Sequence, residues 1–525
     1  MTATMATGTP LDLDRLTIDD VRDAILRDRP VTVLGFARSG IALARFLADA
    51  GARVTIYDGR PEAELADAMA QLDGRSVRLV AGPGVDPAVA WEGAALVTTS
   101  PSINPDYPTT EPRLRAALTA LVTARRAGDP TAPALVSEAD LFLRLCPAPT
   151  VGVTGTKGKT TTASLIAAVL AADAAHPVVL GGNIGVPLIE RLPELTPDHR
   201  VVIELSELQL PTLSRGTTVA VYTNVTSDHL DRHGSLESYR AVKRRLAELV
   251  DPNGALILNV EDPVVATYAD LGTAPVVPYR RGSPDEGGVG ISADDDPWIV
   301  AREVPRLAAA GGGDAETGPA GRVMPLAGLQ IPGWHSISNA LAAVAAGLVF
   351  GVPPDAIRHA VAEFQGVEHR LEEVAIVDRV RFVNDSQGTQ PDAVIAAVQA
   401  FRRPIVLIAG GRDKGVDLSD LAREVAQATS AVVLIGESGP TMAELFSAAG
   451  HERVELADTL ESAVLRADDI ARELLADAGP ADLATVLLSP AAASFDMFVD
   501  YAARGRAFKA AVAELADERR ERRTS

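Results

Sequence analysis

The chain has 525 residues, of which 47% are hydrophobic and 23% are charged, a composition typical of a globular protein with three domains of ~100–200 residues each. Its 70 acidic and 49 basic residues give a formal net charge of -21, so we expect no nucleic-acid partner, because a phosphate polymer would be repelled. The single cysteine, Cys146, excludes an internal disulfide and a Cys-rich metal site, and since neither a signal peptide nor a ~20-residue apolar span is recognisable, we expect a cytoplasmic protein with no membrane partner.

The first block of the chain shows a strand, a glycine turn, a helix and a second strand over 30-PVTVLGFARSGIALARFLADAGARVTIYD-58. The turn Gly35–Gly40 lies where a dinucleotide-binding protein carries G-x-G-x-x-G. Ala37 places a side chain where a pyrophosphate needs none, so the turn favours a nucleotide ligand other than NAD and leaves a purely structural turn open. Asp58 ends the second strand, at the edge where such ligands bind.

The second block opens with 149-PTVGVTGTKGKTTTASLIAAVL-170, an apolar strand, a glycine-rich loop and a helix. The common phosphate-binding loop, G-x-x-x-x-G-K-[ST], would have glycine at position 153, where this chain has Val153. Gly155 and Gly158 still allow the backbone to approach a phosphate, and the helix start directs free N–H groups and a positive dipole end at the same point. Lys159 adds a cation for β- and γ-phosphates and Thr160 adds a hydroxyl for Mg²⁺.

The rest of the second block alternates between apolar strands and helices, which predicts a parallel sheet wrapped by helices. We expect strands at 178–182, 200–206, 218–225 and 255–262, helices at 237–249, 337–350 and 354–364, and a surface hairpin or loose insertion at 282–322.

Acidic and histidine side chains follow two of these strands. Glu204 ends an apolar strand, where it could hold Mg²⁺ or be solvated. A loop after the next strand contains four possible metal ligands or acid–base groups, Asp228, His229, Asp231 and His233. The helix pattern alone favours a surface position for Lys243, and Asn339 is expected to begin a helix.

The third block, from 371, repeats the α/β pattern, with strands expected at 380–385, 404–411, 430–436 and 484–490, helices at 391–401 and 418–428, and a last helix within 502–525. We therefore predict an α/β protein of three domains. These are an N-terminal Rossmann-like domain (1–134), a central P-loop ATPase-type domain with a mostly parallel sheet (135–368), and a C-terminal Rossmann-like domain (369–525).

Short motifs along essentially the whole chain match one family in their order and spacing. They are GTKGKT (155–160), GGNIG (181–185), ELSELQL (204–210), NVTSDHLDRHGSLESYRAVK (224–243), GWHSISNALAA (333–343), HR (369–370), NDS (384–386) and LLSPAAASFDMF (487–498). Through them the chain resembles the Mur ligase family, the ATP-dependent amide-forming enzymes of peptidoglycan precursor synthesis. The N-terminal block and the ending SPAAASFDMFVDYAARGRAF resemble the member that adds D-glutamate to UDP-N-acetylmuramoyl-L-alanine.

The resemblance implies a reaction in which ATP activates a carboxylate as an acyl phosphate, which the amine of glutamate then attacks. It implies two Mg²⁺ ions, one on Thr160 and Glu204 and one on His229 and a carbamylated Lys243. Lys159, Lys243 and His229 would be the catalytic residues. ATP would contact Gly155, Thr156, Lys157, Gly158, Lys159, Thr160, Thr161, Asn339, Arg370 and Asp385. The UDP-linked substrate would contact Arg38, Ser39, Asp58, Arg60 and Asn183. Glutamate would contact Thr389, Lys414, Ser494 and Tyr501.

Some positions depart from the family pattern. Gln387-Gly388-Thr389-Gln390 stands where the pattern has Lys-Ala-Thr-Asn, so a lysine near the acceptor is lost. The acceptor could therefore be L-glutamate or another amino acid, and a folylpolyglutamate-synthase-like ligase is a further alternative. We expect a monomer.

Overall fold

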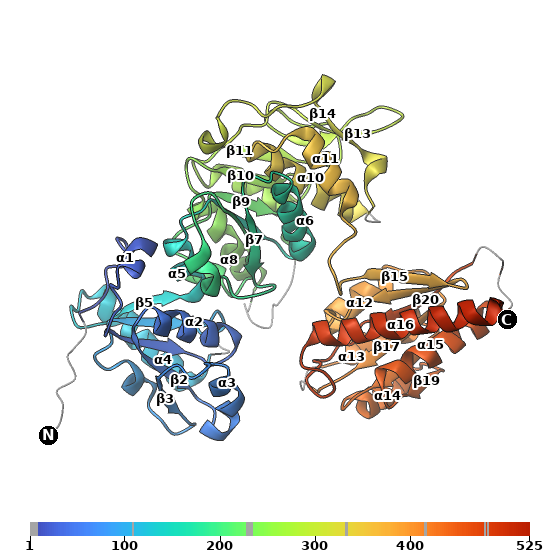
Figure 1. The fold of residues 1–525 in the computed structure, drawn as a ribbon, viewed down its shortest axis with the longest axis horizontal. Helices are drawn as coiled ribbons and strands as arrows, with labels where there is room; N and C mark the ends of the chain where they lie inside the picture. The colour runs from blue at the N-terminus through green and yellow to red at the C-terminus, as the bar shows by residue number, and fades with distance from the viewer. Residues whose placement is uncertain are drawn as a thin grey trace. The chain divides into compact units, whose positions relative to one another are not determined.

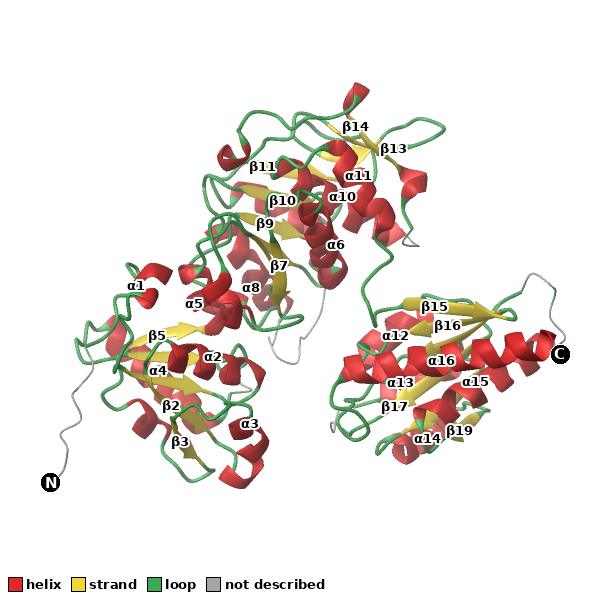
Figure 2. Cartoon of the chain, in the orientation of Figure 1, coloured by secondary structure: helices red, strands yellow, loops and turns green. Residues whose placement is uncertain are grey.

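The computed structural model describes residues 9–107, 110–226, 235–330, 334–413, 417–476, 479 and 482–524. The chain separates into two compact units, Met1–Phe364 and Gln365–Ser525. These units contain three β-sheets with flanking helices, two sheets in the first unit and one in the second (Figure 1). Strands and helices alternate along the chain (Figure 2), which confirms the predicted α/β class with mostly parallel sheets.

The first sheet is fully parallel and has the order β3-β2-β1-β4-β5. Its strands are β1 (Pro30–Leu34), β2 (Arg53–Asp58), β3 (Val77–Ala81), β4 (Leu96–Thr99) and β5 (Ala134–Ser137). The chain order reverses at β1, which places the turn before helix α2 (Arg38–Asp49) where open α/β sheets bind ligands. A Cβ on Gly40 would overlap the Gly35 carbonyl oxygen, so glycine is needed for this close approach of helix and turn.

The second sheet has the order β14-β13-β12-β11-β10-β9-β6-β8-β7. Its strands are β6 (Thr150–Thr154), β7 (Val178–Gly182), β8 (Arg200–Glu204), β9 (Val219–Tyr222), β10 (Ala255–Asn259), β11 (Val276–Tyr279), β12 (Val289–Ile291), β13 (Trp298–Ala301) and β14 (Arg322–Pro325). All pairings from β7 to β12 are parallel, and β12, β13 and β14 pair antiparallel. The expected hairpin in 282–322 is therefore present.

Helices α6 (Lys159–Ala171) and α10 (Trp334–Val349) pack against each other over the second sheet. Nearly every residue of α10 from Ala340 to Val349 is buried, as expected for a helix that is apolar all round. The prediction that Asn339 begins this helix is wrong, because the helix starts at Trp334 and Asn339 lies one turn further on.

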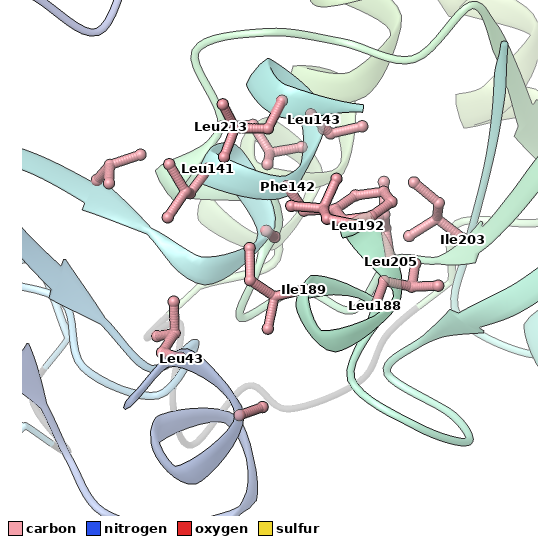
Figure 3. Packing of buried hydrophobic residues seen from close by; sticks show 14 of the residues in the cluster. Leu43, Leu141, Phe142, Leu143, Leu188, Ile189, Leu192, Ile203, Leu205 and Leu213 are labelled. Atoms are coloured by element: carbon pink, nitrogen blue, oxygen red, sulfur yellow. The ribbon is translucent and has the colours of Figure 1, made fainter. Parts of the chain in front are cut away.

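The first and second sheets share one hydrophobic core (Figure 3). Leu43 of α2, Leu141 of α5 (Glu138–Leu145) and Ile189 of the 3-10 helix η3 (Leu188–Glu194) belong to this buried cluster. Arg45 on α2 also forms an ion pair with Glu190 on η3, at 3.1 Å. Because the buried apolar cluster is continuous from α2 to η3, the turn after β1 is held in a defined place relative to the second sheet.

The third sheet, in the second unit, has the order β15-β16-β20-β17-β18-β19, and only β15 runs antiparallel to its neighbour. Its strands are β15 (Glu372–Val377), β16 (Val380–Asn384), β17 (Ile405–Gly410), β18 (Ala431–Ile435), β19 (Val454–Leu456) and β20 (Ala484–Leu488). Its helices are α12 (Pro391–Gln399), α13 (Ser419–Ala428), α14 (Gly439–Ala448), α15 (Leu460–Leu475) and α16 (Tyr501–Thr524).

The remaining helices lie in the first unit and are α1 (Ile18–Arg22), α3 (Ala66–Ala70), α4 (Pro112–Arg126), α8 (Leu236–Leu249), α9 (Pro263–Ala266) and α11 (Pro354–Glu363). Within the described ranges, no helix is both long enough and apolar enough to cross a membrane.

Candidate active site

The glycine-rich loop between β6 and α6 is folded around its own lysine. Gly155 and Gly158 have φ of +149° and +83°, a region that favours glycine. The Lys159 ammonium group donates a hydrogen bond to the Thr156 carbonyl oxygen at 2.8 Å, so the cation lies inside the curve of the loop. The Thr156 backbone N–H donates to the Asn224 carbonyl oxygen at 2.7 Å, which ties the loop to the end of β9. Such a curled loop at a helix start is an anion-binding arrangement.

Glu204, at the end of β8 and beside the loop, joins two other candidate residues. Its carboxylate accepts hydrogen bonds from the Thr160 hydroxyl at 2.7 Å and from the Asn183 side-chain amide at 2.8 Å. β8 pairs directly with β6, and this pairing brings Glu204 to the phosphate-binding loop although 44 residues separate it from Thr160. Glu204 is only 1% exposed.

The pair Thr160–Glu204 has the ligand chemistry of a Mg²⁺ site, because both side chains offer oxygen, which this ion prefers. Among the described residues, no cluster of three or more His, Cys, Asp or Glu side chains could hold a metal ion. Mg²⁺ at a nucleotide site needs no such cluster, since it takes one or two protein ligands together with phosphate oxygens and water. The residues therefore fit the expected ion.

Lys243 lies under the same loop and is completely buried. Its ammonium nitrogen is 3.3 Å from the hydroxyl of Thr154, the residue just before Gly155, and 5.5 Å from the ring centroid of Tyr239. The surface position that the helix pattern favoured is wrong. The expected partner of Lys243, His229, lies outside the described residues, as do Asp228, Asp231 and His233.

Asn339 reaches the start of α6 from α10. Its side-chain oxygen accepts a hydrogen bond from the Thr162 hydroxyl at 3.1 Å, and a Cβ on Gly158 would lie 2.9 Å from the same oxygen. The structure thus places Asn339 against the phosphate-binding loop, together with Glu204 and Lys243.

A cavity of about 330 Å³ opens at the end of the first sheet. It is lined by Gly35, Tyr57, Asp58 and Glu111. Leu208, which follows β8 of the second sheet, also lines it. Burial by itself raises the pKa of Asp58, but hydrogen bonds from Arg60 and from the Phe36 backbone N–H outweigh burial, so the pKa is lowered. Asp58 is therefore an ionised acceptor in the cavity.

Arg38 connects the turn after β1 with the loop that carries Asn183, because its guanidinium donates to the Gly185 carbonyl oxygen at 3.2 Å. Ser39 lies beside it at the start of α2. Glu138, at the start of α5, was not among the predicted residues. It is 5% exposed, and burial raises its pKa to about 7, opposed by the Ile189 backbone N–H and the charge of Arg38. A single Glu in a polar helix start carries no sequence signal of such burial.

In the second unit, Asp385 follows β16 and accepts a hydrogen bond from the Ser489 hydroxyl at 2.6 Å. Burial raises its pKa to about 6, although the charge of Arg370 and the bonds from Ser489 and the Leu371 backbone N–H lower it. The predicted pair Arg370 and Asp385 is thus close in space.

The loops after β16 and β20 carry Thr389 and Ser494, two of the four residues predicted to bind the substrate glutamate, at one edge of the third sheet. Ser386 donates to the Tyr501 carbonyl oxygen at 2.7 Å, and the Gly388 backbone accepts from the Ala491 N–H at 2.8 Å. Thr389 and Ser494 belong to these two loops. The fourth predicted residue, Lys414, lies outside the described residues.

Comparisons with known proteins agree with this arrangement. Residues 153–347 match the Mur ligase middle domain, and residues 369–491 match the Mur ligase glutamate ligase domain. The UDP-N-acetylmuramoylalanine--D-glutamate ligase of Pelotomaculum thermopropionicum is 38% identical over 492 residues, which cover 93% of this chain and 98% of that protein. The protein of the same name from Symbiobacterium thermophilum is 37% identical over 485 residues, covering 92% and 97%.

A solved structure of MurF from Acinetobacter baumannii has a TM-score of 0.52 at 16% identity and covers 95% of this chain and 98% of that one, so the two share a fold. Parallel α/β sheets with a lysine-bearing phosphate loop facing a strand-end acid define the chain as a P-loop nucleotide-binding protein. Its nearly full-length similarity to the two named relatives shows that it belongs to the Mur ligase family.

Proposed function

We propose that this protein is an ATP-dependent ligase that joins D-glutamate to UDP-N-acetylmuramoyl-L-alanine. The observation that carries the proposal is that Thr160 and Asn183 both donate to the buried carboxylate of Glu204, beside the loop that encloses Lys159. This arrangement puts a phosphate-binding cation, a candidate metal-binding acid and a candidate substrate amide together. The relatives named above carry the same activity in their names.

The proposed reaction transfers the γ-phosphoryl group of ATP to the carboxylate of the L-alanyl end, which forms an acyl phosphate and ADP. The amine of glutamate then attacks the acyl carbon, and phosphate leaves as the amide forms. Two anions must approach in the first step, so positive charge has to be in place beforehand. Lys159 and the backbone N–H groups at the N-terminus of α6 supply it, and Mg²⁺ held by Thr160 and Glu204 would neutralise phosphate charge when bound.

We propose three functional regions within the chain. Residues 1–134 would bind the uridine diphosphate part in the cavity beside Asp58, with Arg38, Ser39 and Arg60 along the diphosphate. Residues 135–368 would bind ATP, with Asn339 near the nucleotide, and Lys243 as a carbamate would hold a second Mg²⁺ together with His229. Residues 369–525 would bind the adenosine through Arg370 and Asp385.

The same third region would bind the acceptor through Thr389, Lys414, Ser494 and Tyr501. Gln387, which replaces a lysine of the family pattern, is half-buried, and its backbone N–H donates to the His369 carbonyl oxygen at 3.0 Å. The position is thus held next to the turn that carries Arg370. A glutamine there removes one positive charge from the acceptor side. The identity of the acceptor amino acid is therefore the most specific part of the proposal.

The test is an acceptor screen with the purified full chain, ATP and Mg²⁺. Phosphate release should need both UDP-N-acetylmuramoyl-L-alanine and D-glutamate, and mass spectrometry should find their amide product. Product with L-glutamate but none with D-glutamate would contradict the acceptor assignment. Equal phosphate release in the absence of both substrates would contradict the ligase, and product from a folate with glutamate would favour the folylpolyglutamate-synthase-like alternative.

A further inference from the structure

Arg504, on α16, is the largest fully buried side chain of the described residues, at 1% exposure, and the motifs assigned it no role. Its Nε donates to the Ser386 hydroxyl and its Nη2 to the Ser386 carbonyl oxygen, both at 3.0 Å. Its Nη1 and Nη2 donate to the Ala492 carbonyl oxygen, both at 3.3 Å. One guanidinium group therefore joins the loop after β16 to the loop after β20, the neighbouring strand.

The same group also lies against the end of a third strand. Gly411 follows β17, which pairs with β20, and a Cβ at Gly411 would lie 3.2 Å from Nη1 of Arg504. With a φ of +144°, Gly411 has a backbone conformation that side chains rarely adopt. Arg504 thus reaches the carboxyl ends of three adjacent strands, which is where open α/β sheets bind their ligands.

The charge of Arg504 is not paired with a carboxylate in the part of the chain that the structure describes, since its hydrogen bonds go to a hydroxyl and to carbonyl oxygens. Burial lowers its pKa to about 10, and the charge of Asp496 opposes this, so the group stays protonated at neutral pH. Asp496 itself accepts a hydrogen bond from the Glu437 backbone N–H at 3.0 Å.

Arg200 in the first unit, the other arginine that is buried among the described residues, pairs with Asp173 at 2.8 Å. Arg519, which is partly buried on the same helix as Arg504, pairs with Asp468. A buried cation without a carboxylate is costly for stability, and such a cost is common at binding sites, where a ligand supplies the missing charge. Under the proposed function, the acceptor amino acid would bring carboxylate groups to this same edge.

We propose that Arg504 is a positioning residue for the acceptor amino acid. By holding Ser386 and Ala492, it sets the two loops that carry Thr389 and Ser494, and its charge supplies positive potential for the carboxylates of the acceptor. This inference rests on the proposed ligase function, because only an acceptor that carries carboxylates needs that potential.

The experiment compares the full-length wild type with Arg504→Lys and Arg504→Gln, and uses Arg506→Gln as the matched control, an exposed arginine on the same helix. Steady-state KM values are measured for glutamate and for the UDP-linked precursor, with the melting temperature of each variant. Both Arg504 variants should raise the KM for glutamate by at least about tenfold, the size of one lost charge-assisted contact. The KM for the precursor should stay unchanged, because its proposed contacts lie in the other unit.

Arg504→Gln should raise the KM for glutamate more than Arg504→Lys, because lysine keeps the charge and loses only the bridging geometry. An unchanged KM for glutamate with a lower melting temperature would overturn the proposal in favour of a purely structural tie. Equal effects of lysine and glutamine would overturn the role of the charge. If Arg504→Gln does not fold, the KM values of Arg504→Lys decide whether Arg504 positions the two loops for the acceptor. Wild-type turnover reports on the ligase function separately, so failure of that function is distinguishable from failure of this inference.

Discussion

The buried carboxyl group of Glu138 leads to a stability prediction that can be worked out from the structure. An ordinary glutamate has a pKa of 4.5, and burial raises this one to about 7 in the folded protein. The folded state therefore holds the proton more tightly than the unfolded chain does. The resulting stabilisation is fully present below pH 4.5 and is lost as the pH rises through about 7. The difference between these two pKa values corresponds to about 3 kcal/mol in the free energy of unfolding.

Glu138→Gln should remove this dependence, because an amide of the same shape does not ionise. At about pH 8 the variant should be more stable than the wild type by up to about 3 kcal/mol, and the difference should shrink towards zero near pH 4.5. This gain in stability requires that the amide oxygen of the introduced glutamine still accepts the hydrogen bond from the Ile189 backbone N–H.

The assay is denaturant unfolding followed by tryptophan fluorescence, which reports on the first unit because the three tryptophans, Trp91, Trp298 and Trp334, all lie there. Glu62→Gln, at an exposed position, is the control and should change stability little at any pH. A stability difference between Glu138→Gln and wild type that stays constant from about pH 5 to about pH 8 would refute the reasoning.

Three further predictions concern the nucleotide side. Gly155→Ala would place a Cβ on the Thr223 hydroxyl, so ATP affinity should fall at least about tenfold by calorimetric titration. Gly128→Ala, with a φ of +77° and open space around it, should leave that affinity unchanged. Glu204→Gln should raise the Mg²⁺ concentration for half-maximal activity about tenfold or more, and an unchanged Mg²⁺ titration would count against the metal assignment. Lys243→Ala should abolish turnover, and short-chain carboxylates should restore part of it; no restoration would argue against a carbamate.

Local patterns in the chain were enough for many of the parallel strands and for the phosphate-binding loop. Runs of β-branched and apolar residues predicted β6 and β8 closely, and the glycines with Gly-Lys-Thr predicted the loop and the start of α6. β15 was not predicted, because its sequence EEVAIV is only partly apolar and it lies at the sheet edge, where burial is incomplete.

Sites made by distant segments were harder to predict. Helical periodicity alone placed Lys243 on the surface, since a charged residue usually faces solvent, and only the family resemblance gave it a role. Its ammonium group reaches the Thr154 hydroxyl at the end of β6, and no local pattern encodes that contact. Arg504 lies in the quoted ending that resembles the family, but no role was assigned to it, because its burial depends on loops up to 118 residues away.

The sequence by itself therefore determined the α/β class, the family and the residue types available for phosphate and metal, because these depend on short-range periodicity and motif spacing. Only the tertiary structure decided which of those residues meet. The pairing of β6 with β8 joins Glu204 to Thr160, and the parallel strands β16, β20 and β17 end around Arg504. It also decided which charges are buried: burial raises the pKa of Glu138, and it leaves Arg504 without a carboxylate partner among the described residues. Desolvation depends on everything packed around a group, and packing is a property of the whole fold.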